Sequence, residues 1–256
     1  MKNLEKIIEH FIQSLKNHFT DQVQVHYKNS IIELKSGKTK LCVSTTEYTE
    51  TRLSNRDTFV LPLDLMVTKE KQLLFMLQSK LQLNKRVFAR NCVVKKITAA
   101  EAKTFIDQYH MMGYAKAAYH IGLFLKEELI AVASFSAGRK MNRLEAHQRS
   151  FELIHFCSKE GITITAGLSK ILAFFVQEKH PGDIMTYIDK QFSDGTSYIK
   201  CGFKIHSETA PTKFLINKKT FARKYYKGEA FDKKEFYLTE NFGNIKLVYK
   251  IEKQQV

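Results

Sequence analysis

From residue 92 to about residue 217, short apolar strand patterns alternate with amphipathic helix patterns. Runs rich in β-branched and aromatic residues, such as 92–97 and 184–189, indicate strands. Residues 98–110 and 166–179 instead repeat apolar side chains at helical spacing, and Thr98 with Glu101 is typical of a capping box. This alternation predicts a mixed sheet flanked by helices, an α+β or α/β fold.

The residues ahead of this stretch follow a different pattern. Residues 3–18 predict an amphipathic helix, three short alternating strands follow, and residues 68–83 predict a second helix. We therefore expect a small α+β module over residues 1–88 and a mixed-sheet domain over 89–217. Residues 218–256 are expected to form a basic C-terminal extension of one helix and one strand.

Composition narrows the class of protein. No apolar run approaches the roughly 18–20 residues that span a membrane, so no membrane partner is expected. The four cysteines, at 42, 92, 157 and 201, lie far apart and form no CxxC pair. Such spacing predicts neither a zinc ligand set nor a secreted disulfide scaffold, and we expect a reduced, cytoplasmic protein.

The net charge of +15 is unevenly distributed. Residues 81–98 contain five basic and no acidic side chains, and residues 204–256 contain 12 basic and six acidic ones, interleaved with aromatics. Such segments suit a polyanion, so nucleic acid, most plausibly DNA, is the expected partner. The alternative is a basic surface that serves solubility. The candidate contacts are Lys85, Arg86, Arg90, Lys218, Lys219, Arg223 and Lys224.

Residues 86–215 resemble a known family. In order, they carry the blocks RVFARNCVVKKIT, YHIGLFLKEELIAVASFSAGRK, SFELIHFCS and TAGLSKILAFFVQEKHPGDIMTYIDKQFSDGTSYIKCGF. These blocks are similar to the GNAT-like (Gcn5-related N-acetyltransferase) domain of phage and mobile-element proteins. That subgroup is related to the Mom DNA-modification proteins and to domains fused behind very-short-patch-repair-like endonucleases.

The resemblance implies an acyl donor, acetyl-CoA or another acyl-CoA, whose pyrophosphate sits at a helix N-terminus. In this chain that place is Ala166, Gly167, Leu168, Ser169 and Lys170. The family's Arg/Gln-x-x-Gly-x-Gly/Ala pattern would begin on Thr163, so the basic or amide residue and the first glycine are missing. The alternative is a helix start whose small residues allow close packing.

Tyr198 falls on the position of the family's general acid, which protonates the leaving thiolate. Asp189 ends the preceding strand, where a carboxylate could act as a base or orient the substrate. The alternatives are a packed tyrosine and an aspartate that caps a turn. His110 follows the first helix of the domain, where acceptor substrates approach in this fold.

Two further side chains are candidates for substrate binding. Arg139 could hold a phosphate or carboxylate, and Glu152 either faces the cleft or solvent. The histidines, His155 among them, are scattered without a second ligand at helical or hairpin spacing, so no metal is expected.

The N-terminal third has the position of a nuclease module in relatives of this architecture. Glu33 and Lys35 form an E-x-K pattern, but the next strand carries no acid until Glu47. One carboxylate is a poor magnesium site. We expect a shrunken, inactive, DNA-associated module, or an unrelated α+β cap.

Three functions follow from these residues. The first is a GNAT-fold acyltransferase or Mom-like modification enzyme that acts on nucleic acid or a nucleic-acid-associated amine. The second is a non-catalytic nucleic-acid-binding protein that keeps the fold. The third, a metal nuclease, is the least supported function, because the N-terminal module offers one carboxylate only.

Overall fold

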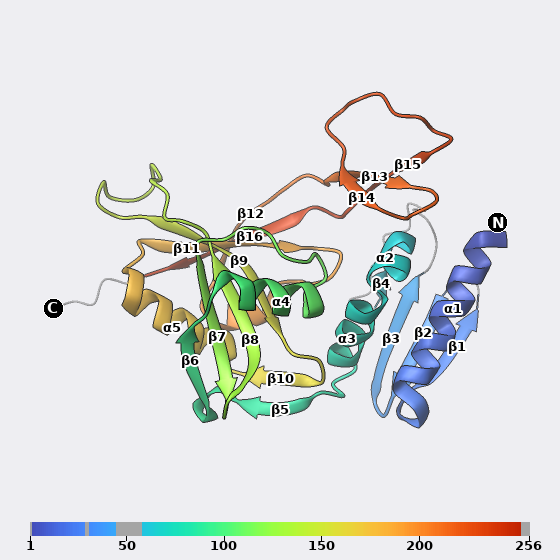
Figure 1. The fold of residues 1–256 in the computed structure, drawn as a ribbon, viewed down its shortest axis with the longest axis horizontal. Helices are drawn as coiled ribbons and strands as arrows, with labels where there is room; N and C mark the ends of the chain where they lie inside the picture. Colours follow the sequence, from blue (N-terminus) through green and yellow to red (C-terminus); the bar gives the residue numbers. More distant parts are fainter. Residues whose placement is uncertain (1, 29–30, 45–57, 252–256) are drawn as a thin grey trace. The chain divides into compact units, whose positions relative to one another are not determined.

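The structure is a computed structural model that describes residues 2–28, 31–44 and 58–251 (Figure 1). The chain divides into two compact units. The first unit combines Met1–Leu83 with Pro211–Phe242, and the second combines Asn84–Ala210 with Gly243–Val256. Among the described residues, no helix is long and apolar enough to cross a membrane.

Unit 1 begins with helix α1 (Lys2–Phe19) and a four-stranded sheet in the order β1-β2-β3-β4. Its strands are β1 (Gln24–Lys28), β2 (Ile31–Ser36), β3 (Thr39–Ser44) and β4 (Thr58–Val60). The predicted amphipathic pattern is confirmed, because Ile8, Phe11 and Leu15 of α1 are buried. Ile32 and Leu34 of β2 are also buried, as alternation along a half-buried strand requires.

Two helices and a second sheet complete unit 1. The helices are α2 (Leu63–Thr68) and α3 (Glu70–Lys80), and Leu73 and Leu77 of α3 are fully buried. The three-stranded sheet has the order β14-β13-β15, from β13 (Lys213–Asn217), β14 (Arg223–Tyr225) and β15 (Phe236–Glu240).

A buried ion pair joins these two parts of unit 1. The Arg223 guanidinium donates two hydrogen bonds, of 2.7 and 2.9 Å, to the carboxylate oxygens of Asp64 at the start of α2. Asp64 is 2% exposed, and Arg223 also lies over the Phe214 ring. A two-point pair of this kind fixes β14 against α2.

Unit 2 is built on a seven-stranded mixed sheet in the order β12-β16-β11-β9-β8-β7-β6. Its strands are β6 (Cys92–Lys96), β7 (Tyr119–Leu125), β8 (Glu128–Phe135), β9 (Ser150–Ser158), β11 (Asp183–Asp189), β12 (Lys204–Glu208) and β16 (Asn244–Lys250). All neighbouring strands run antiparallel except β9 and β11.

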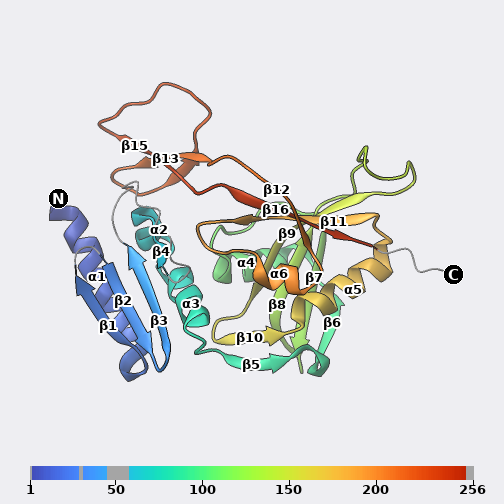
Figure 2. The ribbon, with the colours of Figure 1, turned by 180° about the vertical axis from the view of Figure 1, so that it is seen from behind.

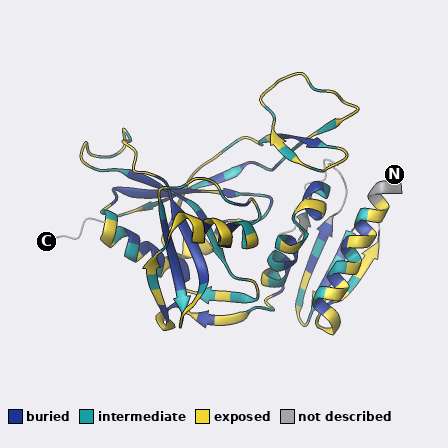
Figure 3. Cartoon of the chain, in the orientation of Figure 1, coloured by how far each residue is buried: buried dark blue, intermediate teal, exposed yellow. Residues whose placement is uncertain are grey.

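Helices α4 (Ala99–Tyr109) and α5 (Gly167–Lys179) cover opposite faces of this sheet (Figures 1 and 2). Ala131 and Ala133 of β8 pack into the cluster that contains Phe175 of α5, whereas Val132 packs with Ile106 of α4. Successive strand residues point to opposite faces, so one strand serves both cores. The buried residues accordingly concentrate in the central strands (Figure 3).

Two smaller elements complete unit 2. Strand β5 (Lys85–Phe88) pairs in parallel with β10 (Ile162–Thr165) to form a separate two-stranded sheet, and the short turn η2 (Ala89–Asn91) follows β5. Helix α6 (Thr196–Lys200) follows β11. The predicted capping box is confirmed, because Thr98 accepts from the Glu101 backbone and Glu101 accepts from the Thr98 backbone.

The mixed α+β class with helices on the sheet and a small N-terminal α+β part is confirmed. The helix expected within residues 218–256 is wrong for the described part, which ends at 251. That segment instead forms β14, β15 and β16. Asn217 explains the error, because its side-chain oxygen accepts from the Lys219 and Thr220 N–H groups, both at 2.9 Å, and bends the chain into a turn.

We expect the Asp64→Asn variant to lose about 3–5 kcal/mol of unfolding free energy, because the Arg223 charge would remain buried without its partner. The control is Glu128→Gln, which removes an ion pair with Lys159 between largely exposed side chains and should cost at most about 1 kcal/mol. Urea unfolding followed by circular dichroism measures both. Similar small losses in the two variants would contradict this role for the buried pair.

Candidate active site

The parallel strands β9 and β11 pair over only three residues. Ser150, Phe151 and Glu152 face Asp183, Ile184 and Met185, and the ladder then stops. The Thr186 hydroxyl donates to the Leu153 carbonyl at 2.9 Å, one residue beyond the ladder. Further along, the carboxyl end of β9 keeps its pairing with β8 but has no ladder partner on the β11 side among the described residues.

A side-chain clamp holds the paired end of these strands together. Arg143 donates to both carboxylate oxygens of Asp183, at 2.7 and 3.0 Å, and to the Ser150 hydroxyl, at 3.0 Å. Asp183 and Ser150 are the first residues of β11 and β9, and both are buried. The strands therefore start together and separate toward their carboxyl ends.

Helix α5 begins at that open end without a side-chain cap. Its N-cap residue, Ala166, adopts a left-handed conformation (φ 61°) and offers no side-chain acceptor. The first N–H groups of a helix have no partner within the helix and carry its positive dipole end. Gly167 is required by packing, since a Cβ there would lie 2.9 Å from Cγ2 of Ile164.

Ser169 and Lys170 point in different directions from this first turn. The Ser169 hydroxyl donates to the Cys201 sulfur, 3.3 Å away, at the end of α6. The Lys170 ammonium donates to the backbone carbonyls of Ala89, at 3.0 Å, and Cys92, at 2.5 Å. Lys170 therefore holds the turn after β5. The sequence predicted a different role for this side chain, as a ligand of a phosphate group.

Tyr198 lies on α6, half-buried, with its ring edge-on to Phe203 at 5.7 Å. Burial, with smaller contributions from the neighbouring Cys157 and Cys201 thiols, raises the pKa of Tyr198 to about 12. Burial also raises the pKa of Cys157 to about 12. Tyr198 and Cys157 therefore hold their protons near neutral pH, so Tyr198 can act there as a hydrogen-bond donor. The hydrogen bond between Ser169 and Cys201 brings α6, the helix that carries Tyr198, next to the start of α5.

Asp189 caps the turn between β11 and α6. Its carboxylate accepts from the Gln191 N–H at 2.8 Å, and its carbonyl accepts from the N–H groups of Phe192 and Ser193. These hydrogen bonds match the alternative given for Asp189 from the sequence, an aspartate that caps a turn. Asp189 thereby shapes the approach to α6.

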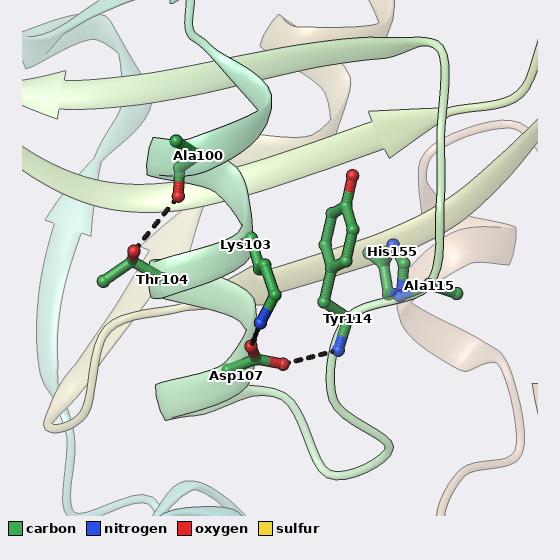
Figure 4. A network of polar contacts seen from close by, with 7 residues as sticks. All are labelled: Ala100, Lys103, Thr104, Asp107, Tyr114, Ala115 and His155. Atoms are coloured by element: carbon green, nitrogen blue, oxygen red, sulfur yellow. Dashed lines mark hydrogen bonds and ion pairs between the residues drawn. The ribbon is translucent and has the colours of Figure 1, made fainter.

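A second polar cluster lies on the α4 side of the sheet (Figure 4). The Asp107 carboxylate pairs with Lys103 and accepts from the Tyr114 N–H at 2.9 Å. The next residue, Ala115, donates its N–H to Nε2 of His155 at 3.1 Å. The His155 ring is nearly parallel to that of Tyr114, with centroids 5.9 Å apart. Helix α4 and β9 thus both hold the segment after α4.

His155 is 4% exposed, and its Nδ1 atom has no hydrogen-bond partner. Because Nε2 accepts from Ala115, the neutral ring carries its proton on Nδ1. Burial is the main cause that lowers the pKa of His155. The Gly113 carbonyl acts in the opposite direction but does not reach hydrogen-bond geometry. Neither the spacing of the histidines nor a motif could identify this residue in advance.

His110 belongs to the same cluster, with its ring edge-on to His155 at 5.2 Å. Its Nδ1 accepts from the Met112 N–H at 3.3 Å. His110 packs with the α4-side group, while Tyr198 packs into the core cluster that contains α5. No described contact brings the two predicted catalytic side chains together.

Arg139 and Glu152 form an ion pair at 3.7 Å, and Arg139 also pairs through its backbone with Ser150. Both lie at the amino end of β9, whereas Cys157, the neighbour of Tyr198, lies at its carboxyl end. A shallow groove along α4 also lies apart from Tyr198 and α5. It is bordered by Thr104, Phe105, Gln108, Tyr109, Leu129 and Lys159, among others.

The predicted nucleic-acid contacts have different surroundings. Lys85, Arg86 and Arg90 are exposed. Arg223 forms the buried ion pair with Asp64. Lys218 donates a hydrogen bond to the Lys233 carbonyl, and the Lys224 ammonium lies 5.0 Å from the centroid of the Phe236 ring. Lys219 is exposed in the turn after β13.

Glu33 pairs at 2.7 Å with Lys40 of the next strand, and Glu47 lies outside the described residues. No group of three or more His, Cys, Asp or Glu suited to a metal ion occurs in the described residues.

No family model and no curated protein matches the sequence. Over part of its length, the chain is similar in structure to solved acetyltransferases. A GNAT family acetyltransferase from Elizabethkingia anophelis with acetyl-CoA bound is 14% identical, with a TM-score of 0.40 over 63% of this chain and 99% of that chain.

The IAA acetyltransferase from Bacillus cereus is 13% identical, with a TM-score of 0.38 over 62% of this chain and 99% of its own. The ribosomal-protein-S18-alanine N-acetyltransferase from Escherichia coli is 9% identical, with a TM-score of 0.37 over 64% and 98%. Scores and identities of this size do not assign a function.

Acid should destabilise the fold through the buried histidines. Burial lowers the pKa of His155 and of His120, while an unfolded histidine titrates near about 6.5. Above that pH both states are neutral; below it the unfolded chain binds more protons, so stability falls as the pH decreases from 7 toward 5.

The His155→Gln variant keeps an acceptor for the Ala115 N–H and should lose less stability than the parent protein as the pH decreases, as measured by Tm between pH 5 and 8. The control is His147→Gln, at an exposed site, whose Tm should depend on pH as that of the parent protein does. An unchanged pH dependence in His155→Gln would contradict the assignment.

Proposed function

We propose that unit 2 is a GNAT-type group transferase that takes an acyl group from acetyl-CoA or another acyl-CoA. One observation carries the proposal: the uncapped N-terminus of α5 lies where β9 and β11 separate, and α6 brings Tyr198 to the same place. Three features lie together there: the N-terminus of α5, which favours anions, the unpaired edge of β9, and the protonated phenol of Tyr198.

The residues present fit such a donor in physical terms. The N–H groups of Gly167, Leu168 and Ser169 would hold the pyrophosphate, because a helix N-terminus without a side-chain cap favours anions. The unpaired edge of β9 beyond Glu152 would hold an extended arm through backbone hydrogen bonds. When bound, an acyl-CoA supplies a thioester, whose C–S bond breaks as the acyl carbon bonds to the acceptor nitrogen.

Tyr198 would provide the proton that the leaving sulfur requires. Its raised pKa keeps the phenol protonated at neutral pH, and the nearby Cys157 thiol is protonated as well. Asp189 acts through the turn that it caps and is a positioning residue.

For the acceptor we propose an amine of nucleic acid or of a nucleic-acid-associated molecule. The support is the net charge of +15 and the exposed cations near residues 85–90. A Mom-like modification of DNA is one form of this activity. Mass analysis of DNA co-expressed with the protein tests that form, and unmodified nucleosides would exclude it.

A second candidate is a nucleic-acid-binding protein without transfer chemistry. The observation that favours it is Lys170, the only basic residue in the predicted loop 166–170, whose ammonium bonds the Ala89 and Cys92 carbonyls. The packing requirement at Gly167 points the same way, since it explains that glycine without a ligand.

Ser169→Glu should weaken acetyl-CoA binding by about tenfold or more, because a carboxylate at the helix N-terminus opposes a phosphate anion. The same carboxylate favours the helix itself, so folding should be preserved. Ala173→Glu places the charge one turn further along, at an exposed position, and is the matched control. Calorimetric titration with acetyl-CoA measures both. Equal affinities, or no binding by the parent protein, would reject the donor site.

Tyr198→Phe should lower the turnover number by roughly 10²–10⁴-fold, because the proton donor is lost, while acetyl-CoA affinity changes little. Release of the CoA thiol in the presence of mixed-sequence DNA measures turnover. Tyr187→Phe, an exposed tyrosine on β11, is the control. Full activity in Tyr198→Phe would leave the tyrosine with a packing role only.

A further inference from the structure

The two-stranded sheet of β5 and β10 has one exposed face. Arg86 and Phe88 of β5 lie on it, in register with Thr163 and Thr165 of β10, and all four are exposed. Val87, between the two β5 residues, points the other way into the core. Phe88 is 43% exposed, which is unusual for a phenylalanine on a regular strand.

Arg90 completes this face from the turn after β5. Its guanidinium carbon lies 5.0 Å from the centroid of the Phe88 ring. An arginine against an exposed aromatic ring combines a cation with a flat apolar platform. The Lys170 contacts to Ala89 and Cys92 hold this turn in place, so the platform sits on a supported backbone.

Arg86 and Arg90 are not paired with a carboxylate. No carboxylate of the described residues lies within ion-pair distance of either guanidinium, nor of the neighbouring Lys85. The next two lysines along the chain differ, because Lys95 lies 3.9 Å from Glu127 and Lys96 pairs with Glu178. Residues 85–90 therefore carry three cations without an ion-pair partner among the described residues.

We propose that the face formed by Arg86, Phe88 and Arg90 binds single-stranded nucleic acid, with a base stacked on Phe88 and phosphates on the two guanidinium groups. Charge complementarity selects a polyanion, and the exposed ring selects one with flat apolar groups. A single strand fits better than a duplex, since paired bases offer no free face to Phe88. The proposal deepens the acceptor class proposed above, but binding here does not require acyl transfer.

The test is fluorescence anisotropy with a 5′-fluorescein-labelled 16-nucleotide oligodeoxythymidine, measured over a range of salt concentrations without acetyl-CoA. Phe88→Ala should weaken binding by roughly 5- to 150-fold without changing the salt dependence, since it removes stacking alone. Arg86→Gln with Arg90→Gln should reduce the slope of log K against log salt by roughly 1.4, about 0.7 for each lost phosphate contact.

The matched controls are Ile205→Ala and Lys204→Gln on β12, another exposed apolar residue and another exposed cation of unit 2. Both should bind as the parent protein does. Unaltered binding in Phe88→Ala, or a labelled duplex that binds as tightly as the single strand, would overturn the proposal. Displacement of the oligonucleotide by CoA, with dephospho-CoA ineffective, would instead identify the face as part of a donor site. The outcome is independent of the Ser169→Glu titration, so the two proposals can fail separately.

Discussion

The clamp made by Arg143 holds the first residues of β9 and β11 together. The parallel pairing of the two strands covers only the first three positions of each. Parallel strands usually continue side by side, and their backbone groups then satisfy one another. Here the carboxyl end of β9 is left with one free edge, and the elements that begin or end nearby, α5 and α6, gather around it.

In this arrangement, the residues at the start of α5 have structural roles that leave them few side-chain groups for binding a ligand. Gly167 is needed for contact with Ile164, and Lys170 is needed to hold the turn after β5. Gly167 has no side chain and the Lys170 ammonium is bonded elsewhere, so any anion bound there relies on backbone N–H groups and the dipole of α5. Backbone recognition tolerates sequence change, which is compatible with a loop that lacks the expected glycine pattern.

Much of the fold could be predicted from local sequence. The capping box at Thr98 and Glu101, the apolar runs of β7 and β8 and the alternation along β9 are short-range signals that depend on neighbouring residues. The turn at Asn217 was missed because its polar and aromatic surroundings also suit a helix. Strands β5 and β10 are only four residues long each, too short to give a clear period.

The site was less predictable, because its contacts join distant residues. Residues 167–170 and Tyr198 belong to the two helices expected there, but the direction of the Lys170 side chain depends on carbonyls about 80 positions earlier. Arg223 pairs with an aspartate 159 positions away, which no local pattern could indicate. Cys157 of β9 lies near Tyr198 of α6, although the two residues are far apart in the sequence.

The position of β16 has a consequence for how the chain is made. After β12 the chain leaves unit 2 for residues 211–242 and then returns as β16, which lies between β11 and β12 in the sheet. During synthesis the edge strand β12 emerges before the strand that attaches it, so the sheet has an open edge on β11 until β16 has left the ribosome. Both units are interrupted along the chain, and neither can be obtained as one continuous fragment. Because the segments of the two units alternate along the chain, neither an end-to-end fusion nor a single insertion could exchange one unit for another.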